Sequence, residues 1–95
     1  MPRMNRKAAR RDSNEPEIVN ALVKAGATVM KISDSGYPDL VVGFRKKDGS
    51  LFNALMEIKT EKGVVRNDQQ TFIDKWHGAV WIVRTVEQAL EIINL

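Results

Sequence analysis

The sequence predicts an α/β domain in which helices flank a central mixed sheet, in the order α-β-β-β-α-β with a C-terminal helix. Three observations predict this class. Apolar residues recur at three- and four-residue spacing in three segments, which is the pattern of amphipathic helices. Four short runs of β-branched and apolar residues lie between these segments and indicate strands. The 95 residues contain no repeat, no low-complexity stretch and no internal linker, so a single domain is expected.

The first half of the chain contains one helix and three strands. The helix is predicted to follow Asn14, with Pro16 tolerated in its first turn and Gly26 as its stop. The strands are predicted at residues 28–32, 40–44 and 51–60, and the second is apolar enough to be buried on both faces. Between the second and third strands, Asp48-Gly49 favours the positive φ angles of a tight hairpin.

The second half of the chain contains a helix, a short strand and a last helix. A basic loop at residues 62–66 leads to Asn67, a predicted helix cap. The apolar side chains that share one face of this helix are Phe72, Ile73 and Trp76. Residues 80–83 form the fourth strand. Thr85, followed three residues later by Gln88, fits a capping box at the start of the last helix.

The net charge of +3 is unevenly distributed. Residues 1–11 carry five basic groups and no acidic one, whereas the other 84 residues hold 10 basic and 12 acidic groups. We therefore predict a basic, flexible N-terminal arm at residues 1–12 and a folded domain at residues 13–95. Such arms commonly follow nucleic-acid phosphates, and the alternative is a solubilising leader. The basic residues of the arm are Arg3, Arg6, Lys7, Arg10 and Arg11.

Composition excludes several function classes. The absence of cysteine excludes a disulfide framework, a cysteine metal site and a thiol nucleophile, and a single histidine excludes histidine-rich metal clusters. No apolar run approaches the roughly 18–20 residues of a membrane span, and no signal-peptide segment opens the sequence. We therefore expect a cytoplasmic domain without a membrane partner, whose chemistry comes from carboxylates, amines, hydroxyls, amides and any metal they hold.

Polar residues interrupt two predicted strands whose other residues are mostly apolar, as in strands of a hydrophobic core. Asp39 stands at the start of the second strand, while Glu57 and Lys59 share one face near the end of the third. Burying an acid and an amine in a central strand is costly unless they are paired or bind an ion. Two carboxylates and the Ile58 carbonyl would suit Mg²⁺ or Mn²⁺, beside a lysine able to orient a water. The alternative is a Glu57–Lys59 surface pair on an edge strand, with Asp39 capping a turn.

The first helix offers a further acid, either Glu15 or Glu17. Extending its apolar stripe back by one turn reaches Glu15, so this side chain is predicted to face the sheet. Glu17 lies on the solvent side, three residues after Asn14, where a capping-box glutamate bonds back to the cap. We therefore interpret Glu15 as the functional candidate and Glu17 as the structural one.

These residues resemble the signature of the PD-(D/E)XK nucleases. Gly36-Tyr37-Pro38-Asp39 is followed, after 17 intervening residues, by Glu57-Ile58-Lys59. The element order resembles the restriction-endonuclease-like core of that superfamily. More narrowly, residues 13–93 resemble a stand-alone VRR-NUC (virus-type replication-repair nuclease) domain of phages and bacteria, in which a basic glycine loop precedes a helix bearing glutamine, here Gln69. Arg66 departs from the pattern, because a small hydroxyl residue is common at that position.

The resemblance implies a nuclease that hydrolyses phosphodiester bonds of DNA with Mg²⁺ or Mn²⁺ as cofactor. The ion would be held by Asp39, Glu57 and the main-chain carbonyl of Ile58. Lys59 would position the attacking water, and Gln69 would orient the lysine, a water or the phosphate. Glu15 would hold a second ion or a water on the first, and whether one ion or two are used stays open.

DNA would reach such a site along positive surface. The candidate contacts, besides the arm, are Tyr37, Lys46, Lys47, Lys62 and Arg66. No helix combines Arg, Asn and Gln at major-groove spacing, so recognition of DNA shape, such as a Holliday junction or a flap, is favoured over sequence reading. The resemblance also implies a homodimer, as in the similar archaeal junction resolvases, acting in a bacterial or phage-infected cell.

Two rival interpretations stay open. The chain could be a nuclease without junction preference, or a non-catalytic DNA-binding module in which Glu57 and Lys59 form a structural ion pair. His77 is interpreted as a residue at a helix end, and Trp76 and Trp81 as core or dimer-interface residues.

Overall fold

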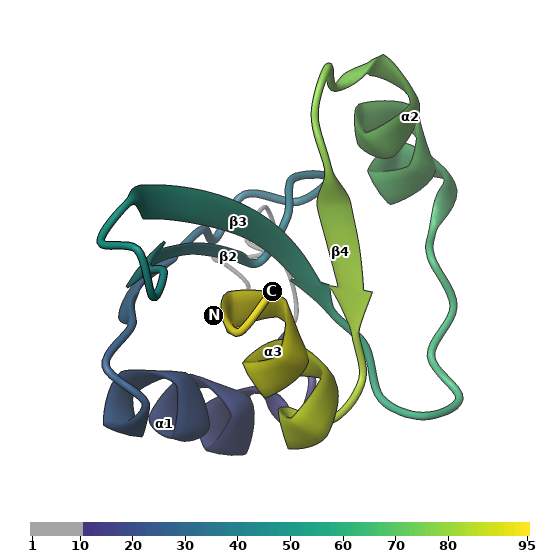
Figure 1. Ribbon diagram of the computed structural model, residues 1–95. Helices are drawn as coiled ribbons and strands as arrows, with labels where there is room; N and C mark the ends of the chain where they lie inside the picture. The colour runs from purple at the N-terminus through teal and green to yellow at the C-terminus, as the bar shows by residue number, and fades with distance from the viewer. Residues whose placement is uncertain (1–10) are drawn as a thin grey trace.

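The computed structural model describes residues 11–95 and confirms the predicted element order (Figure 1). The helices are α1 Glu15–Lys24, α2 Asn67–Lys75 and α3 Val86–Ile93. The strands are β1 Thr28–Lys31, β2 Leu40–Arg45, β3 Leu51–Ile58 and β4 Val80–Val83. The predicted phosphate contacts Arg3, Arg6, Lys7 and Arg10 lie outside the described residues. Among residues 11–95, no helix has the length and apolar character needed to span a bilayer.

The four strands form one mixed sheet in the order β1-β2-β3-β4. β2 runs antiparallel to β1 and to β3, and β4 returns parallel to β3 after the α2 crossover. β3 is therefore an inner strand with a partner on each side. The alternative that Glu57 and Lys59 form a surface pair on an edge strand is wrong, because the strand is central and both side chains are buried.

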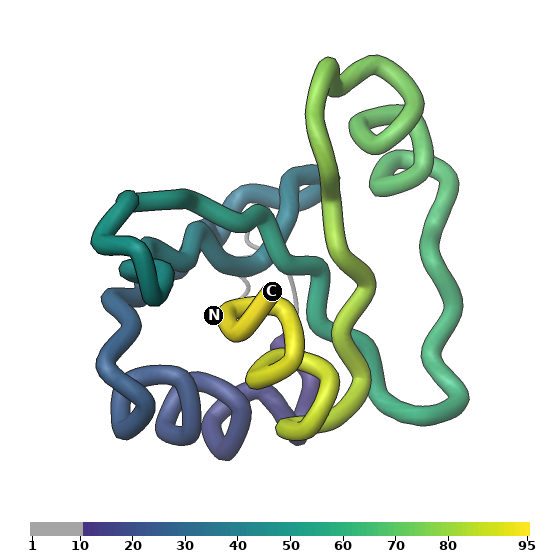
Figure 2. Tube along the Cα trace, in the orientation of Figure 1, coloured from purple at the N-terminus to yellow at the C-terminus, as the bar shows by residue number. Residues whose placement is uncertain are grey.

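One face of the sheet carries the hydrophobic core. Leu40, Val42, Met56 and Ile58 are fully buried on this face, since alternate residues of a strand point to the same side. α1 and α3 pack against each other and cover this face (Figures 1 and 2). The helices contribute the buried apolar side chains of Ile18, Leu22, Ala89, Ile92 and Ile93.

The opposite face of the sheet is more open. Val41 and Leu55 are only half-buried there, and Met30 is exposed, because α1 and α3 lie on the other side (Figure 1). The prediction that residues 40–44 are buried on both faces is therefore wrong. Asp39 alternates with Leu40 and Glu57 alternates with Met56, so both carboxylates belong to this open face, where β2 begins and β3 ends.

α2 lies apart from the layer that α1 and α3 form (Figure 1). It ends at Lys75, one residue before Trp76, which is 48% exposed. Trp81 on β4 is 37% exposed, so neither tryptophan is a core residue, and their role in an interface stays a prediction. His77 follows the end of the helix, as predicted, and is exposed.

The helix caps differ in part from those predicted. Thr85 accepts a hydrogen bond from the backbone N–H of Gln88, but the Gln88 side chain bonds to the backbone N–H of Arg84 rather than to Thr85. The side chain of Asn14 makes no capping bond and Glu17 is exposed, so the capping box predicted for α1 is wrong. Arg66, rather than Asn67, precedes α2 as its N-cap residue.

Candidate active site

Asp39 lies directly before β2 and is 5% exposed. Its Oδ2 accepts a hydrogen bond of 2.8 Å from the backbone N–H of Ile58 on β3. β2 and β3 are antiparallel, and Leu40 lies opposite Met56. Extending this register by two residues, backward from Leu40 and forward from Met56, places Pro38 opposite Ile58. Proline has no N–H to offer the Ile58 carbonyl. Because the N–H and C=O of one strand residue point the same way, this carbonyl faces Asp39 as a possible ligand.

Glu57 is held between a lysine and a glutamine. Its Oε2 lies 3.6 Å from Nζ of Lys59 and accepts a hydrogen bond of 2.5 Å from Nε2 of Gln69. All three side chains are buried. The other end of the Gln69 amide accepts a hydrogen bond from the backbone N–H of Arg66, so the first turn of α2 orients Gln69 toward β3. The strand end and the helix start thus form one hydrogen-bonded group.

The electrostatics of this group favour a cation. Burial, and next the negative charge of Asp39, raise the pKa of Glu57 to about 8, although Lys59 acts in the opposite direction. Two carboxylates that share one site resist simultaneous ionisation unless positive charge is added. A divalent cation would supply that charge.

Glu15, at the start of α1, is buried as the helical stripe predicts. Its Oε2 accepts a hydrogen bond of 3.0 Å from Arg11, while its buried Oε1 has no hydrogen-bond partner among the described residues. Burial raises the pKa of Glu15, and Arg11 opposes that rise. Glu15 is therefore a third acid near the site, already partly neutralised by an arginine.

The residues present fit a hard divalent ion. Asp39, Glu57 and the Ile58 carbonyl offer the oxygen ligands that Mg²⁺ and Mn²⁺ prefer, and the unpartnered Oε1 of Glu15 offers a further acceptor. Within residues 11–95, no three Asp, Glu or His side chains come close enough together to form a metal site on their own. Such an ion would thus complete its ligand shell with water, as Mg²⁺ usually does.

Three residues hold the site together in ways that the sequence did not reveal. Arg11, which the sequence places in the basic arm as a predicted DNA contact, bonds to Glu15 and to Asp39. Asn14 donates hydrogen bonds of 3.0 Å to the carbonyls of Lys59 and Arg84 and so ties α1 to the ends of β3 and β4. Each of these bonds spans more than twenty residues of sequence except the one to Glu15, and no local pattern signals such long-range pairing.

The third is Arg84, at the end of β4. Its guanidinium donates to the carbonyls of Thr60, Glu61 and Gly63, and so fixes the loop that follows Lys59. Hydrogen bonds from a charged guanidinium are stronger than neutral ones, so these bonds restrain the loop. In the sequence, Arg84 is a single basic residue at the end of a strand, a pattern too common to predict this role.

The predicted DNA contacts fall into two groups. Tyr37, Lys62 and Arg66 lie within three residues of Asp39, Lys59 and Gln69, at the same end of the sheet as the acids. These three side chains are exposed, and Tyr37 packs edge-on against Phe72 of α2.

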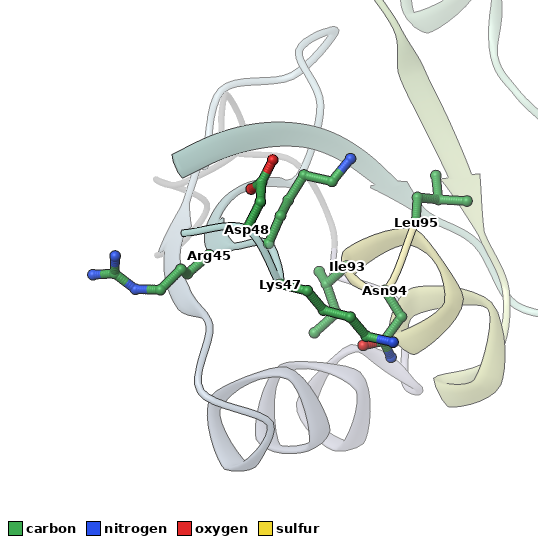
Figure 3. Close-up of a pocket in the computed structure, with 7 residues that line it drawn as sticks. Arg45, Lys47, Asp48, Ile93, Asn94 and Leu95 are labelled. Carbon is green, nitrogen blue, oxygen red and sulfur yellow. The ribbon is translucent and has the colours of Figure 1, made fainter. Parts of the chain in front are cut away.

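Lys46 and Lys47 form the second group, at the hairpin tip. They lie at the far end of β2 from Asp39, a separation of roughly 20 Å for a strand of that length. Together with Arg45 and Asp48 they line a pocket closed by Ile93, Asn94 and Leu95, in which Lys47 extends beside Asn94 while Arg45 points away (Figure 3). These lysines are therefore separate from the acidic site.

Comparison with known proteins gives one positive finding. Neither the search of curated proteins nor that of solved structures gave a match. The model of the VRR-NUC domain matches residues 2–86, which is most of the chain. The chain therefore belongs to the VRR-NUC family, a family of PD-(D/E)XK-type nucleases, and has a restriction-endonuclease-like fold.

Proposed function

We propose that this chain is a structure-selective DNA endonuclease that uses Mg²⁺ or Mn²⁺ to hydrolyse phosphodiester bonds, with branched DNA such as Holliday junctions or flaps as its substrate. The observation that carries the proposal is the buried group of Asp39, Glu57 and Lys59 at the end of two paired strands. Nucleases of this type generally use divalent ions, and these residues fit one.

Asp39, Glu57 and the Ile58 carbonyl would hold the ion, which when bound supplies Lewis acidity and lowers the pKa of water at the scissile phosphate. Lys59 then has two roles. Its ammonium, fixed 3.6 Å from Glu57, orients the attacking water and offsets charge that develops on the phosphate. Gln69 positions Glu57 through its 2.5 Å hydrogen bond, and Glu15 binds a water on the ion.

Shape, rather than base sequence, is the basis of DNA recognition in this proposal. The open face of the sheet and the exposed Tyr37, Lys62 and Arg66 beside the acids provide phosphate contacts at the site. The position of β4 at the edge of the sheet formed by residues 11–95 and the exposed Trp76 and Trp81 support a homodimer, which would present two sites to a symmetric junction. We place this activity in the cytoplasm of a bacterial or phage-infected cell.

A catalytically silent DNA-binding module is the second candidate. It is favoured by one observation, the 3.6 Å contact between Glu57 and Lys59, which a purely structural ion pair would also make. A nuclease without junction preference is the other alternative. One cleavage assay separates all three.

The assay incubates four-way, flap and linear DNA with the protein in Mg²⁺, Mn²⁺ or EDTA. We expect metal-dependent cleavage of branched DNA that falls at least about 100-fold in Asp39→Asn and in Lys59→Met, because each removes part of the transition-state stabilisation. Lys24→Ala, an exposed lysine at the end of α1, is the matched control and keeps full activity.

DNA binding in EDTA, measured by anisotropy, should be retained in both site variants. Equal cleavage of linear and branched DNA would favour the nuclease without junction preference. Binding without cleavage in any metal would favour the silent module. Cleavage that survives both substitutions would place the site elsewhere.

A further inference from the structure

Arg11 makes more contacts to the candidate site than any role in a basic arm requires. Its Nε donates to Oε2 of Glu15 at 3.0 Å, and its two terminal nitrogens donate to the main-chain carbonyls of Ile32 and Asp39 at 2.5 and 3.3 Å. One of these nitrogens also lies 4.0 Å from Oδ1 of Asp39. The guanidinium therefore bridges two of the three acids.

The position of this guanidinium is set by backbone as well as by carboxylates. The backbone N–H of Ile32 donates to the carbonyl of Asp39 at 2.8 Å and closes the turn that contains the Gly-Tyr-Pro-Asp segment. Arg11 donates to the carbonyls of Ile32 and Asp39, the two residues at the ends of this turn. A planar guanidinium with several fixed donors suits such a place better than a lysine would, and it stays charged at every physiological pH.

The charge of the site limits how many cations it can accept. Glu15, Asp39 and Glu57 supply three carboxylates, and the cations that form ion pairs with them are Arg11 and Lys59. When all are ionised, one net negative charge is left. A single divalent ion changes the net charge of these groups from −1 to +1. A second ion would raise it to +3 in a poorly solvated site, which is unfavourable.

Glu15 is also poorly placed as a direct ligand of a second ion. Arg11 occupies its Oε2, and no group of three acids within the described part of the chain is close enough to hold a metal. Its buried Oε1 has no hydrogen-bond partner within residues 11–95 and can accept a hydrogen bond from water. Both observations favour an indirect, water-mediated role for Glu15.

On the basis of the proposed metal-dependent function, we infer that Arg11 is a positioning residue that takes the place of a second metal ion, so that each site binds one divalent cation. The arginine supplies the positive charge that a second ion would otherwise bring to Glu15 and Asp39. It also holds Glu15 at a distance from which the carboxylate reaches the bound ion only through water.

The test counts Mn²⁺ ions bound to the full chain by isothermal titration calorimetry and by electron paramagnetic resonance, without DNA. The wild-type protein should bind one Mn²⁺ per chain. Arg11→Met, which removes the charge but keeps much of the volume, should bind two. Arg11→Lys should restore binding of one ion, and Arg45→Met, an exposed arginine at the hairpin tip, should leave it at one.

Each result is decisive for Arg11. Two ions in the wild-type protein, or one ion in a folded Arg11→Met variant, would overturn the inference while leaving metal-dependent cleavage intact. Two ions in Arg11→Lys would do the same, and this variant covers the case in which Arg11→Met does not fold. No Mn²⁺ binding in any variant would overturn the proposed function together with the inference.

Discussion

Glu57 moves on folding from water into a site that it shares with a second carboxylate. Burial and the charge of Asp39 raise its pKa to about 8 from the ordinary value of 4.5. An acid with a raised pKa binds more protons in the folded state, so between these two values the free energy of unfolding falls as pH rises. Burial raises the pKa of Glu15 as well, which acts in the same direction.

We therefore predict that the metal-free protein loses about 3 kcal/mol of unfolding free energy between pH 5 and pH 8. Glu57→Gln should flatten this dependence, because the amide keeps a similar shape without a charge. Glu17→Gln, which changes an exposed glutamate in the first turn of α1, should leave it unchanged. Urea unfolding in EDTA at pH 5, 6.5 and 8 measures the effect, and a flat wild-type profile would contradict it.

At the scale of single residues, the acids and the lysine could be predicted from the sequence because polar residues in apolar strands are conspicuous. The stripe of α1 likewise placed Glu15 toward the interior and Glu17 in solvent. Arg11 could not be assigned in this way. Four basic residues precede it in the sequence, whereas its partners Ile32 and Asp39 are more than twenty residues away.

Among the elements, α2 depends on a few specific contacts to keep Gln69 over the site. Asp68 accepts a hydrogen bond from Ser35, and Phe72 packs against Tyr37, so the turn after β1 supports the start of this helix. Gly36 in that turn has φ +90°, a left-handed conformation that favours glycine. A Cβ at this position would lie 3.4 Å from Oδ2 of Asp68.

Gly36→Ala should therefore lower both stability and cleavage. The left-handed backbone costs an alanine about 1–2 kcal/mol, and the added methyl group would contact the Asp68 side chain in the first turn of α2. Gly49→Ala is a close control, because Gly49 also has φ +90° but has open space around its Cβ position. We expect similar losses of melting temperature in both variants and a loss of cleavage, of about tenfold, only in Gly36→Ala. Equal cleavage by the two variants would show that this turn does not position the site.

The order of helices and strands was predictable because hydrophobic periodicity is a local signal. The predictions for whole elements that are wrong concern packing between elements that lie far apart in the sequence. The second strand, apolar throughout, was expected to be covered on both faces, but both α1 and α3 pack on one side and leave Val41 half-buried. Asn14 was expected to cap its own helix, but its amide bonds to two strand ends that sequence patterns do not bring together.

For the molecule as a whole, charge is distributed along the length of the β2–β3 hairpin. The acidic site lies at one end, with exposed Lys62 and Arg66 nearby, and the basic tip with Lys46 and Lys47 lies at the other. The separation of roughly 20 Å corresponds to about six base pairs of DNA, given the rise of a strand and of a duplex. A duplex arm that leaves the site along the open face of the sheet would thus reach the tip.

The double variant Lys46→Ala/Lys47→Ala tests whether DNA follows this path. Each lysine that neutralises a phosphate contributes about 0.9 to the slope of log binding constant against log salt concentration, so we expect the slope to fall by up to about 2. Binding should weaken similarly for every sequence, because phosphates carry no base information. Cleavage of DNA that is already bound should proceed at the wild-type rate, since the tip does not touch the acids.

Lys24→Ala/Lys75→Ala, which removes the same charge from two helix ends, is the control. Anisotropy titrations from 50 to 200 mM salt measure DNA binding by the wild-type protein and both double variants. An equal fall in slope for both double variants would mean that net charge, rather than a contact at the hairpin tip, accounts for the effect.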